Sequence, residues 1–196
     1  MPRTKEQNMA IRTEKKQLIM NTALQLFAEK GFERTTTECI AQHAGISSGL
    51  LFVYFKSKDD LLQSIWDRLV NEFIHMIDPN QDGEVTQDEA ENFIDKTFEM
   101  LINRREEMKL YFQTSSQPEV INFLKHKFDA KRVAERQEFI IKYFADKLPV
   151  ADATNAYITV LAFVKGLSMV LTYTETVFDI ETLENYKKFI KSVFFK

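Results

Sequence analysis

Two short helix-forming segments on either side of Gly45 constrain the fold of this chain more than any other feature of its sequence. Ala41, Gly45 and Leu51 have the offsets of a helix-turn-helix. In that unit a small residue lets two helices cross closely, glycine allows the tight turn, and a later apolar residue fills the shared core. Any small helical hairpin can show the same pattern, so the spacing predicts the local fold and leaves its function open.

The rest of the chain also has helical spacing. Only five Gly and four Pro occur among 196 residues, and 44% of the residues are hydrophobic, which disfavours both disorder and a turn-rich β protein. Apolar residues recur three and four positions apart in almost every segment. We therefore predict an all-α fold, with helices at about 14–30, 35–44, 48–54, 58–77, 87–104, 106–115, 119–147, 152–174 and 180–195.

Capping residues mark the ends of the first helices. Gly31 is a natural stop after Lys30, and Thr35 with Glu38 three residues later predicts a capping-box start for the second helix. Ser47 and Ser57 are suited to cap the third and fourth helices.

The charge of the chain is divided unequally. The net charge is −3, yet residues 1–58 hold nine Lys and Arg against five Asp and Glu, while the remainder holds 17 against 24. This asymmetry favours a basic head that meets an anion and an acidic body that does not.

The compartment is also indicated by the sequence. Cys39 is the only cysteine, which excludes an internal disulfide framework, and the charged N-terminus lacks the apolar stretch of a secretory signal. The apolar segment 156–174 is interrupted by Lys165 and Gly166, so we expect a buried or interface helix and no membrane partner. A cytoplasmic protein is expected.

The run from Ala23 to Leu62 resembles the DNA-binding domain of the tetracycline-repressor (TetR) family of bacterial transcriptional regulators. The matching elements follow one another in register: Leu26-Phe27, Gly31-Phe32, Thr35-Thr36, Ile40-Ala41, Ala44-Gly45, Ser47, Gly49, Leu51, Tyr54-Phe55 and Ser57-Lys58. The resemblance implies about nine helices, with an N-terminal arm and three-helix helix-turn-helix head at 1–58 and an effector-binding and dimerisation body at 59–196.

The head contains candidate DNA contacts of two kinds. At the start of the second helix, hydroxyl and backbone N–H groups are suited to receive a phosphate, whereas the first turn of the third helix is the part that reaches base edges. By resemblance, further positions grip the phosphate backbone, and where relatives often have Tyr this chain has Phe52, which lacks the hydroxyl. The candidates are Thr35, Thr36, Thr37, Ser47, Ser48, Gly49, Leu50, Phe52, Tyr54, Lys56 and Lys58.

The acidic segment "DPNQDGEVTQDE", residues 78–89, has the spacing of an EF-hand calcium loop. Oxygen-bearing groups occupy loop positions one, three, five, seven, nine and twelve, and Gly83 stands at the sixth, where the chain bends sharply. The same residue types also supply ordinary turns and helix caps, and EF-hands usually occur in pairs. Ca²⁺ is thus a possible cofactor but not a required one, with candidate ligands Asp78, Asn80, Asp82, Glu84, Thr86 and Glu89.

Aromatic residues are frequent in the predicted body, where the resembling family binds a small effector. Ordinary core packing explains many of them, but an apolar or aromatic effector is expected. The candidates for lining its site are Trp66, Phe73, Phe98, Phe112, Phe128 and Tyr157.

The last two predicted helices carry apolar stripes suited to a homodimer. One stripe includes Leu167, Ser168 and Leu171, and the other includes Leu183, Phe189 and Val193. Packing within one subunit is the alternative for both stripes.

Together these features predict a regulator without enzymatic activity. No metalloprotease signature, phosphate-cradling glycine loop or nucleophile elbow occurs in the sequence. We expect a homodimeric repressor that binds double-stranded operator DNA and is released by a small effector. The alternative is a calcium-sensing helical interaction protein that uses the 78–89 loop.

Overall fold

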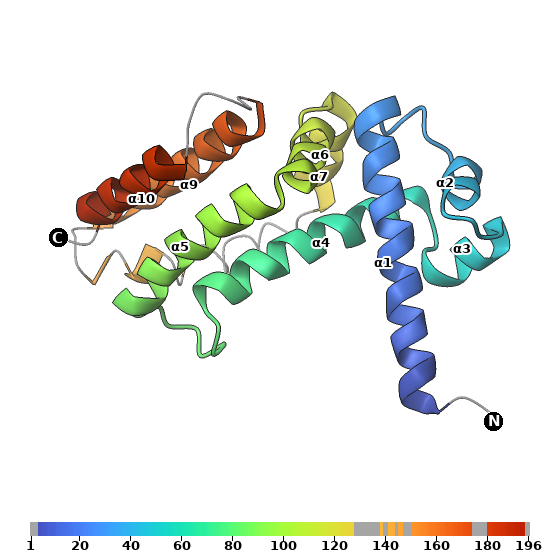
Figure 1. Cartoon of the computed structure of the whole chain (residues 1–196), viewed down its shortest axis with the longest axis horizontal. Coiled ribbons are helices and arrows are strands. Elements are labelled where there is room, and N and C mark those ends of the chain that lie inside the picture. Colours follow the sequence, from blue (N-terminus) through green and yellow to red (C-terminus); the bar gives the residue numbers. More distant parts are fainter. Residues whose placement is uncertain are drawn as a thin grey trace. The chain divides into compact units, whose positions relative to one another are not determined.

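The fold is all-α. The computed structural model describes residues 4–127, 138, 141–143, 145–146, 150–173 and 180–194, and within that part all regular structure is helical (Figure 1). The helices are α1 (Lys5–Lys30), α2 (Thr37–His43), α3 (Ser48–Tyr54), α4 (Lys58–Ile77), α5 (Gln87–Asn103), α6 (Arg105–Ser115), α7 (Pro118–Lys127), α9 (Val150–Tyr173) and α10 (Ile180–Phe194). The predicted bounds are confirmed to within a few residues for α2, α3, α4, α5, α6, α9 and α10.

The chain divides into two compact units. The first comprises Met1–Leu69 with Leu110–Lys127, and the second comprises Val70–Lys109 with Phe128–Lys196. Helices α4 and α6 each contribute residues to both units. The first unit therefore adds the first half of α4, the second half of α6 and all of α7 to the head expected from the sequence.

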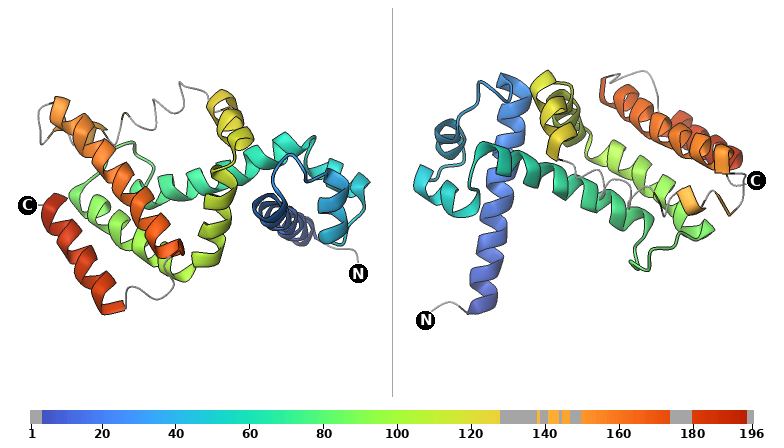
Figure 2. Two further views of the ribbon diagram at one scale, coloured as in Figure 1. Left: turned by 90° about the horizontal axis from the view of Figure 1, so that it is seen from above. Right: turned by 180° about the vertical axis from the view of Figure 1, so that it is seen from behind.

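The first unit is built around one face of α1. Ile19, Phe27, Ile40, Leu51 and Phe55 are all buried in its core. Apolar residues of α4 join them, including Leu61, Leu62 and Ile65. Figure 2 shows α2 and α3 as two short helices beside the long α1.

Polar side chains tie the later helices of this unit to α1. The guanidinium of Arg68 on α4 donates to the side-chain oxygens of Gln17 at 2.6 Å and Asn21 at 2.7 Å. It also donates to the hydroxyl of Tyr111 on α6 at 2.9 Å. The Trp66 and Tyr111 rings meet edge to face, with centroids 5.4 Å apart.

The start of the chain differs from the prediction. Helix α1 begins at Lys5, because Thr4 and Gln7 form a capping box nine residues before the expected start near Glu14. Lys5 and Arg12 are therefore helical residues of α1.

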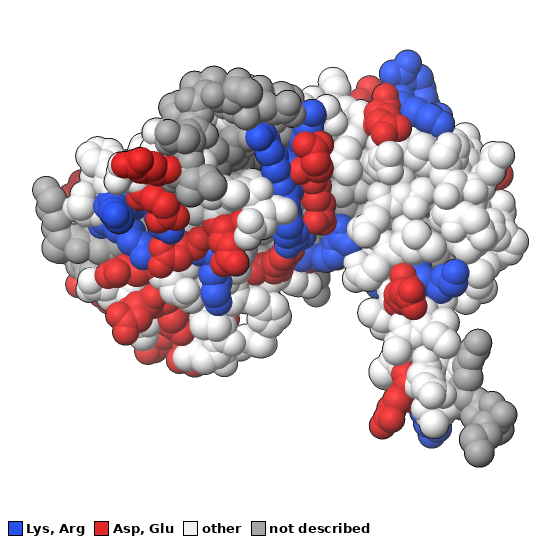
Figure 3. Space-filling view, viewed as in Figure 1, with Lys and Arg blue, Asp and Glu red and all other residues white. Residues whose placement is uncertain are grey.

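The second unit is organised by α5, which packs against both α9 and α10. Ile94, Phe98 and Leu101 are the buried apolar residues of its inner face. Lys191 of α10 forms an ion pair with Asp95 of α5 at 2.5 Å. On the face seen in Figure 3, Asp and Glu side chains gather over this unit, in keeping with an acidic body.

Within the described ranges, none of the helices combines the length and the apolar character needed to cross a bilayer. The helix predicted at 119–147 is described as α7 up to Lys127, and most of its remainder lies outside the described residues.

Candidate nucleic-acid interface

The turn between α2 and α3 has the geometry predicted from its glycine. Gly45 has φ +66°, a left-handed conformation that favours glycine. The Ile46 N–H donates to the carbonyl oxygen of Ala41 at 3.0 Å, which closes the end of α2. Ala41 and Leu51 are buried where the two helices meet. The structure thus contains the predicted helix-turn-helix.

Helix α3 presents one buried and one exposed face. The hydroxyl of Ser47 accepts the Leu50 N–H at 3.2 Å, so Ser47 is the N-cap, as predicted. Leu51 and the neighbouring Phe55 are buried, but Phe52 is 48% exposed and Val53 is 66% exposed. A Cβ atom added at Gly49 would meet no atom within 4 Å. The outer face of α3 is therefore open and largely apolar.

Sequence reasoning missed Val53 as a candidate contact. It lies four residues after Gly49, which places it on the same face of α3. Helical spacing alone would have found it.

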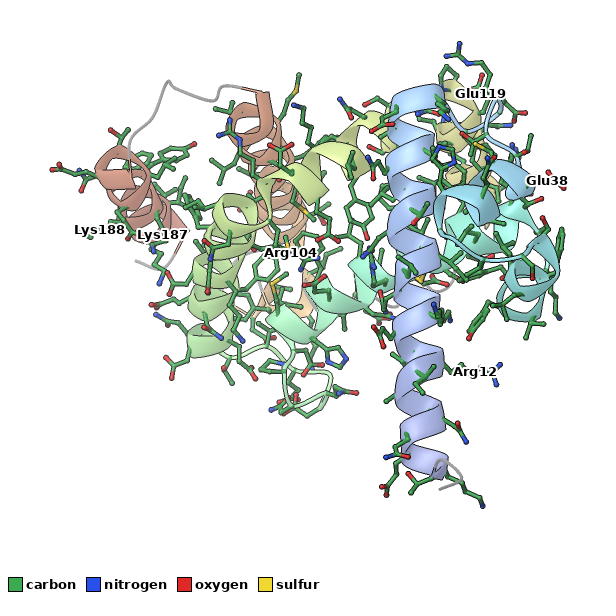
Figure 4. All side chains as sticks on the ribbon, turned by 45° about the vertical axis from the view of Figure 1, so that its right-hand side comes forward. Arg12, Glu38, Arg104, Glu119, Lys187 and Lys188 are labelled. Atoms are coloured by element: carbon green, nitrogen blue, oxygen red, sulfur yellow. The ribbon has the colours of Figure 1, made fainter. Side chains whose placement is uncertain are left out.

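Cationic side chains of α1 lie next to the end of α3. The Arg12 Cζ is 5.9 Å from the centre of the Tyr54 ring, and the Lys16 Nζ is 5.7 Å from the centre of the Phe55 ring. Arg12 projects from α1 in Figure 4. Positive charge from α1 thus lies next to the C-terminal end of α3.

The start of α2 corrects the predicted role of Thr35. Thr36 is the N-cap, and its hydroxyl accepts the Cys39 N–H at 3.1 Å. Thr35 is 0% exposed, and its hydroxyl donates to the carbonyl oxygens of Gly31 at 2.8 Å and Leu26 at 3.3 Å. The expectation that Thr35 receives a phosphate is therefore wrong, because its hydroxyl is inside the head.

Glu38 stands at the same helix start. Its own backbone N–H and the hydroxyls of Thr36 and Thr37 lower the pKa of its carboxyl group, because they stabilise the charged form. Figure 4 shows Glu38 on α2. A negative charge thus occupies the position where Thr36 and Thr37 are expected to receive a phosphate.

Lys58 makes contacts within the head. Its ammonium group donates to the carbonyl oxygens of Phe32 at 2.8 Å and Glu33 at 3.3 Å, and it lies 4.3 Å from the centre of the Phe32 ring. Lys58 therefore holds the segment between α1 and α2. Lys56 is exposed, and its backbone N–H donates to Asp60 at 2.8 Å.

Cys39 lies in the first turn of α2. It is partly exposed, and its Sγ lies 3.7 Å from both Lys30 Nζ and His43 Nδ1.

The candidate effector residues fall in different units. Trp66 and Phe112 belong to the first unit, whereas Phe73 and Phe98 belong to the second. Phe73 lies 6.3 Å from Phe93, and Phe98 lies 6.4 Å from Tyr186, measured between ring centroids. The side chains of Phe128 and Tyr157 lie outside the described residues.

The loop at 78–89 is fully described. Thr86 caps α5, and Glu89 completes a capping box with it. Across the described residues, no three His, Cys, Asp or Glu side chains are grouped closely enough to hold a metal ion. In this arrangement Thr86 and Glu89 are cap residues of α5.

The two C-terminal helices expose apolar side chains. On α10, Phe189 is 59% exposed, Tyr186 and Val193 are also exposed, and the Tyr186 and Phe189 rings stack. Ile158 and Met169 are exposed on α9. Leu167, Ser168, Leu183 and Ile190 are buried within the unit. The described residues Leu167 and Ser168 of the predicted α9 stripe therefore pack inside one subunit, and the exposed residues of α9 lie outside that stripe. The predicted α10 stripe is divided, with Leu183 and Ile190 packed inside and Phe189 and Val193 facing outward.

Comparison with known proteins agrees with this geometry. Residues 19–65 match the model of the family described as bacterial regulatory proteins, tetR family. The chain is 30% identical over 130 residues to the biofilm operon icaADBC HTH-type negative transcriptional regulator IcaR of Staphylococcus epidermidis, covering 66% of this chain and 69% of the relative. It is 32% identical to the fatty acid metabolism regulator protein of Bacillus subtilis over 60 residues, which is 31% of each chain.

Solved structures share the fold. A transcriptional regulator from Aquifex aeolicus is similar with a TM-score of 0.66 and 22% identity, over 92% of this chain and 99% of that chain. A regulator from Pseudomonas aeruginosa is similar with a TM-score of 0.67 and 14% identity, over 93% and 91% of the two chains.

Proposed function

The chain belongs to the TetR family of bacterial transcriptional regulators, and on that basis we propose that it is a repressor that binds operator DNA as a homodimer and is released by a small effector. The observation that carries the proposal is the open outer face of α3, held on the Gly45 turn by the buried Leu51. A short helix that exposes its first turn in this way fits the major groove of duplex DNA.

The contacts divide into two kinds. Ser48, Gly49 and Leu50 in the first turn of α3 reach base edges, together with Phe52 and Val53 further along the helix. Thr37, Tyr54 and Lys56 meet phosphates, with Arg12 and Lys16 adding positive charge from α1.

The outer face of α3 contains no Arg, Asn or Gln, the residues best suited to bidentate base contacts. Leu50, Phe52 and Val53 instead offer apolar contacts, for which the thymine methyl group is the matching feature of the major groove. We infer that the operator is read through thymine methyls and DNA shape more than through hydrogen bonds.

Effector binding in the body acts on the heads through α4. This helix contributes Lys58–Leu69 to the first unit and Val70–Ile77 to the second, so a shift at its far end reaches the DNA-binding unit along one continuous element. The abundance of aromatic side chains in the body favours an apolar or aromatic effector.

Dimerisation supplies the second half-site. A single short recognition helix contacts too few base pairs for useful specificity, and a two-fold dimer doubles the site. The exposed apolar residues of α9 and α10, among them Met169 and Phe189, are the surface that we assign to the partner subunit.

Operator DNA as the partner implies that the protein acts in the cytoplasm and that its activity is binding, without catalysis. Family membership also makes duplex DNA the partner of the helix-turn-helix head. Family membership therefore favours operator binding over the calcium-sensing interaction protein as the function.

The decisive experiment is selection of bound fragments from the source genome, followed by titration of a selected fragment at several salt concentrations. We expect affinity to fall steeply as salt rises, because phosphate contacts release counterions. Gly49→Asp should abolish binding, since a Cβ at Gly49 meets no neighbouring atom and the added charge faces DNA. Asn122→Asp adds the same charge to the exposed surface of α7 and should bind normally. Salt-independent binding, or equal loss in both variants, would overturn the proposal.

A further inference from the structure

The loop between α4 and α5 carries polar groups that helix capping alone does not explain. Its twelve residues, 78–89, follow the EF-hand spacing, and two of them have positive φ: Gln81 at +59° and Gly83 at +77°. The Gly83 N–H donates to Asp78 Oδ2 at 3.1 Å, and the Glu84 N–H donates to Asp82 Oδ1 at 2.8 Å. The Asp78 carboxylate is thus directed toward the sixth position of its own loop.

Asp78 is the residue that points to a ligand. It is only 6% exposed, whereas Asn80 and Asp82 are exposed to solvent. Its second carboxylate oxygen, Oδ1, is buried without a hydrogen-bonding partner. A buried carboxylate oxygen in that condition is costly, and a cation is the partner that compensates its charge most fully.

We propose that the 78–89 loop binds a single Ca²⁺ ion. The ligands are the side chains of Asp78, Asn80 and Asp82, the main-chain carbonyl of Glu84 and the carboxylate of Glu89, with the Thr86 position contributing directly or through water. The seventh position of such a loop contributes its main-chain carbonyl, and the exposed Glu84 carboxylate lies 3.6 Å from the ammonium group of Lys142. The site is independent of the DNA-binding function proposed above.

Binding requires Glu89 to turn. Its carboxylate accepts hydrogen bonds of 2.9 Å from both the backbone N–H and the hydroxyl of Thr86, and in this arrangement the described loop carboxylates are not grouped closely enough to hold an ion. The Thr86 hydroxyl also accepts the Glu89 N–H at 3.2 Å, and this cap persists when the carboxylate moves. Glu89 is therefore able to reach the ion without unravelling the start of α5.

The donor set favours Ca²⁺ over Mg²⁺. All the groups are oxygens, and a twelve-residue loop that closes with a bidentate glutamate suits the six to eight ligands of Ca²⁺. Mg²⁺ demands a tighter octahedron and retains water. An ion held here would fix the end of α4 (Val70–Ile77) to the start of α5, both in the second unit.

The test is calorimetric titration of the full-length chain with CaCl₂ after treatment with a chelator, alongside thermal melts with Ca²⁺ or Mg²⁺. We expect one site with a Kd of roughly 10⁻⁵ to 10⁻³ M, a higher Tm in Ca²⁺, and a smaller effect of Mg²⁺. Glu89→Gln should weaken binding at least about tenfold, because a neutral amide replaces the bidentate ligand. Glutamine still completes a capping box, so this variant should keep its helix content by circular dichroism.

Asp88→Asn is the matched control. Asp88 is the exposed neighbour of Glu89 at the eleventh loop position, which supplies no ligand, so this variant should bind Ca²⁺ like the parent. Absence of any Ca²⁺-dependent heat or Tm shift up to about 10 mM would overturn the proposal. Equally weakened Ca²⁺ binding in Asp88→Asn and Glu89→Gln would also overturn it, because Ca²⁺ would then be attracted by the general negative charge of the surface and not by specific ligands. Operator binding measured with chelator present tests the DNA-binding function separately.

Discussion

The Nε2 of Gln117 donates a hydrogen bond of 2.6 Å to the carbonyl oxygen of Phe27, ninety residues earlier in the sequence. Its Oε1 accepts the Phe32 N–H at 2.7 Å. The Gln117 side-chain amide, next to the start of α7, thus forms hydrogen bonds with backbone groups on both sides of Gly31. Gly31 has φ +90° and ends α1. The end of α1 is completed by a residue from outside the head.

We expect Gln117→Ala to destabilise the first unit. The partly buried Phe27 carbonyl and Phe32 N–H would lose this partner, at a cost of about 1–3 kcal/mol in the free energy of unfolding. Urea unfolding of the variant measures the change. Asn122→Ala, at an exposed position of α7, is the control and should change stability by less than about 0.5 kcal/mol. Matching stabilities for the two variants would show that the Gln117 bonds contribute nothing net.

Glu38 is expected to weaken operator binding. Its carboxylate occupies the start of α2, so Glu38→Gln should tighten binding by roughly twofold to fivefold at low salt through the loss of one repulsion with phosphate. Fluorescence anisotropy with a selected operator measures the difference. Glu119→Gln removes the same charge from α7, where Figure 4 shows Glu119, and should have a smaller effect. Weaker binding by Glu38→Gln would refute this role.

The same carboxyl group has a defined pH dependence. Because its pKa is lowered in the folded protein, the charged form contributes stability above the pKa of the unfolded chain. That contribution is lost as the pH falls through the lowered folded value. An NMR titration should therefore find the Glu38 pKa below that of an unstructured glutamate, and a normal or raised value would contradict the proposed hydrogen bonds.

Caps and turns that depend on residues close in sequence could be predicted, whereas contacts between residues far apart in sequence could not. Ser47 and Gly45 act on residues within five positions, so the cap of α3 and the turn before it could be predicted. Among three consecutive threonines, however, the capping pattern cannot select the cap, and only tertiary burial shows that Thr35 is internal and Thr36 is the N-cap.

No sequence pattern predicts the long-range hydrogen bonds of the first unit. Arg68 bonds to Tyr111 across 43 residues and to Gln17 across 51 residues. Neither pair forms a periodic or motif-like signal, because their meeting depends on how α1, α4 and α6 pack. The sequence could not predict that α7 belongs to the first unit, because this too depends on how the helices pack.

Thymine methyl groups should contribute to operator affinity. Leu50 and Val53 are exposed apolar residues on the outer face of α3, and apolar side chains in the major groove contact the C5 methyl of thymine. Replacing a contacted thymine by uracil removes one methyl group, worth about 0.8 kcal/mol or roughly a fourfold loss of affinity. Titrations with singly substituted operators measure this, and Leu50→Ala should abolish the sensitivity at one position. Uniform affinity across all substituted operators would exclude methyl readout.

Phe189 should be essential for the dimer and, through it, for operator binding. Its ring is 59% exposed on α10 and stacks on Tyr186, with centroids 6.5 Å apart, so the pair forms an apolar projection suited to a symmetric partner. Phe189→Glu places a charge in that interface, and we expect a monomer by analytical ultracentrifugation with at least about a hundredfold loss of operator affinity. Lys188→Glu is the control, because it makes a larger charge change at the adjacent exposed position and should remain dimeric. If the Phe189→Glu protein stays dimeric, the interface does not lie on this face of α10. If it is monomeric but binds the operator normally, operator binding does not depend on dimerisation.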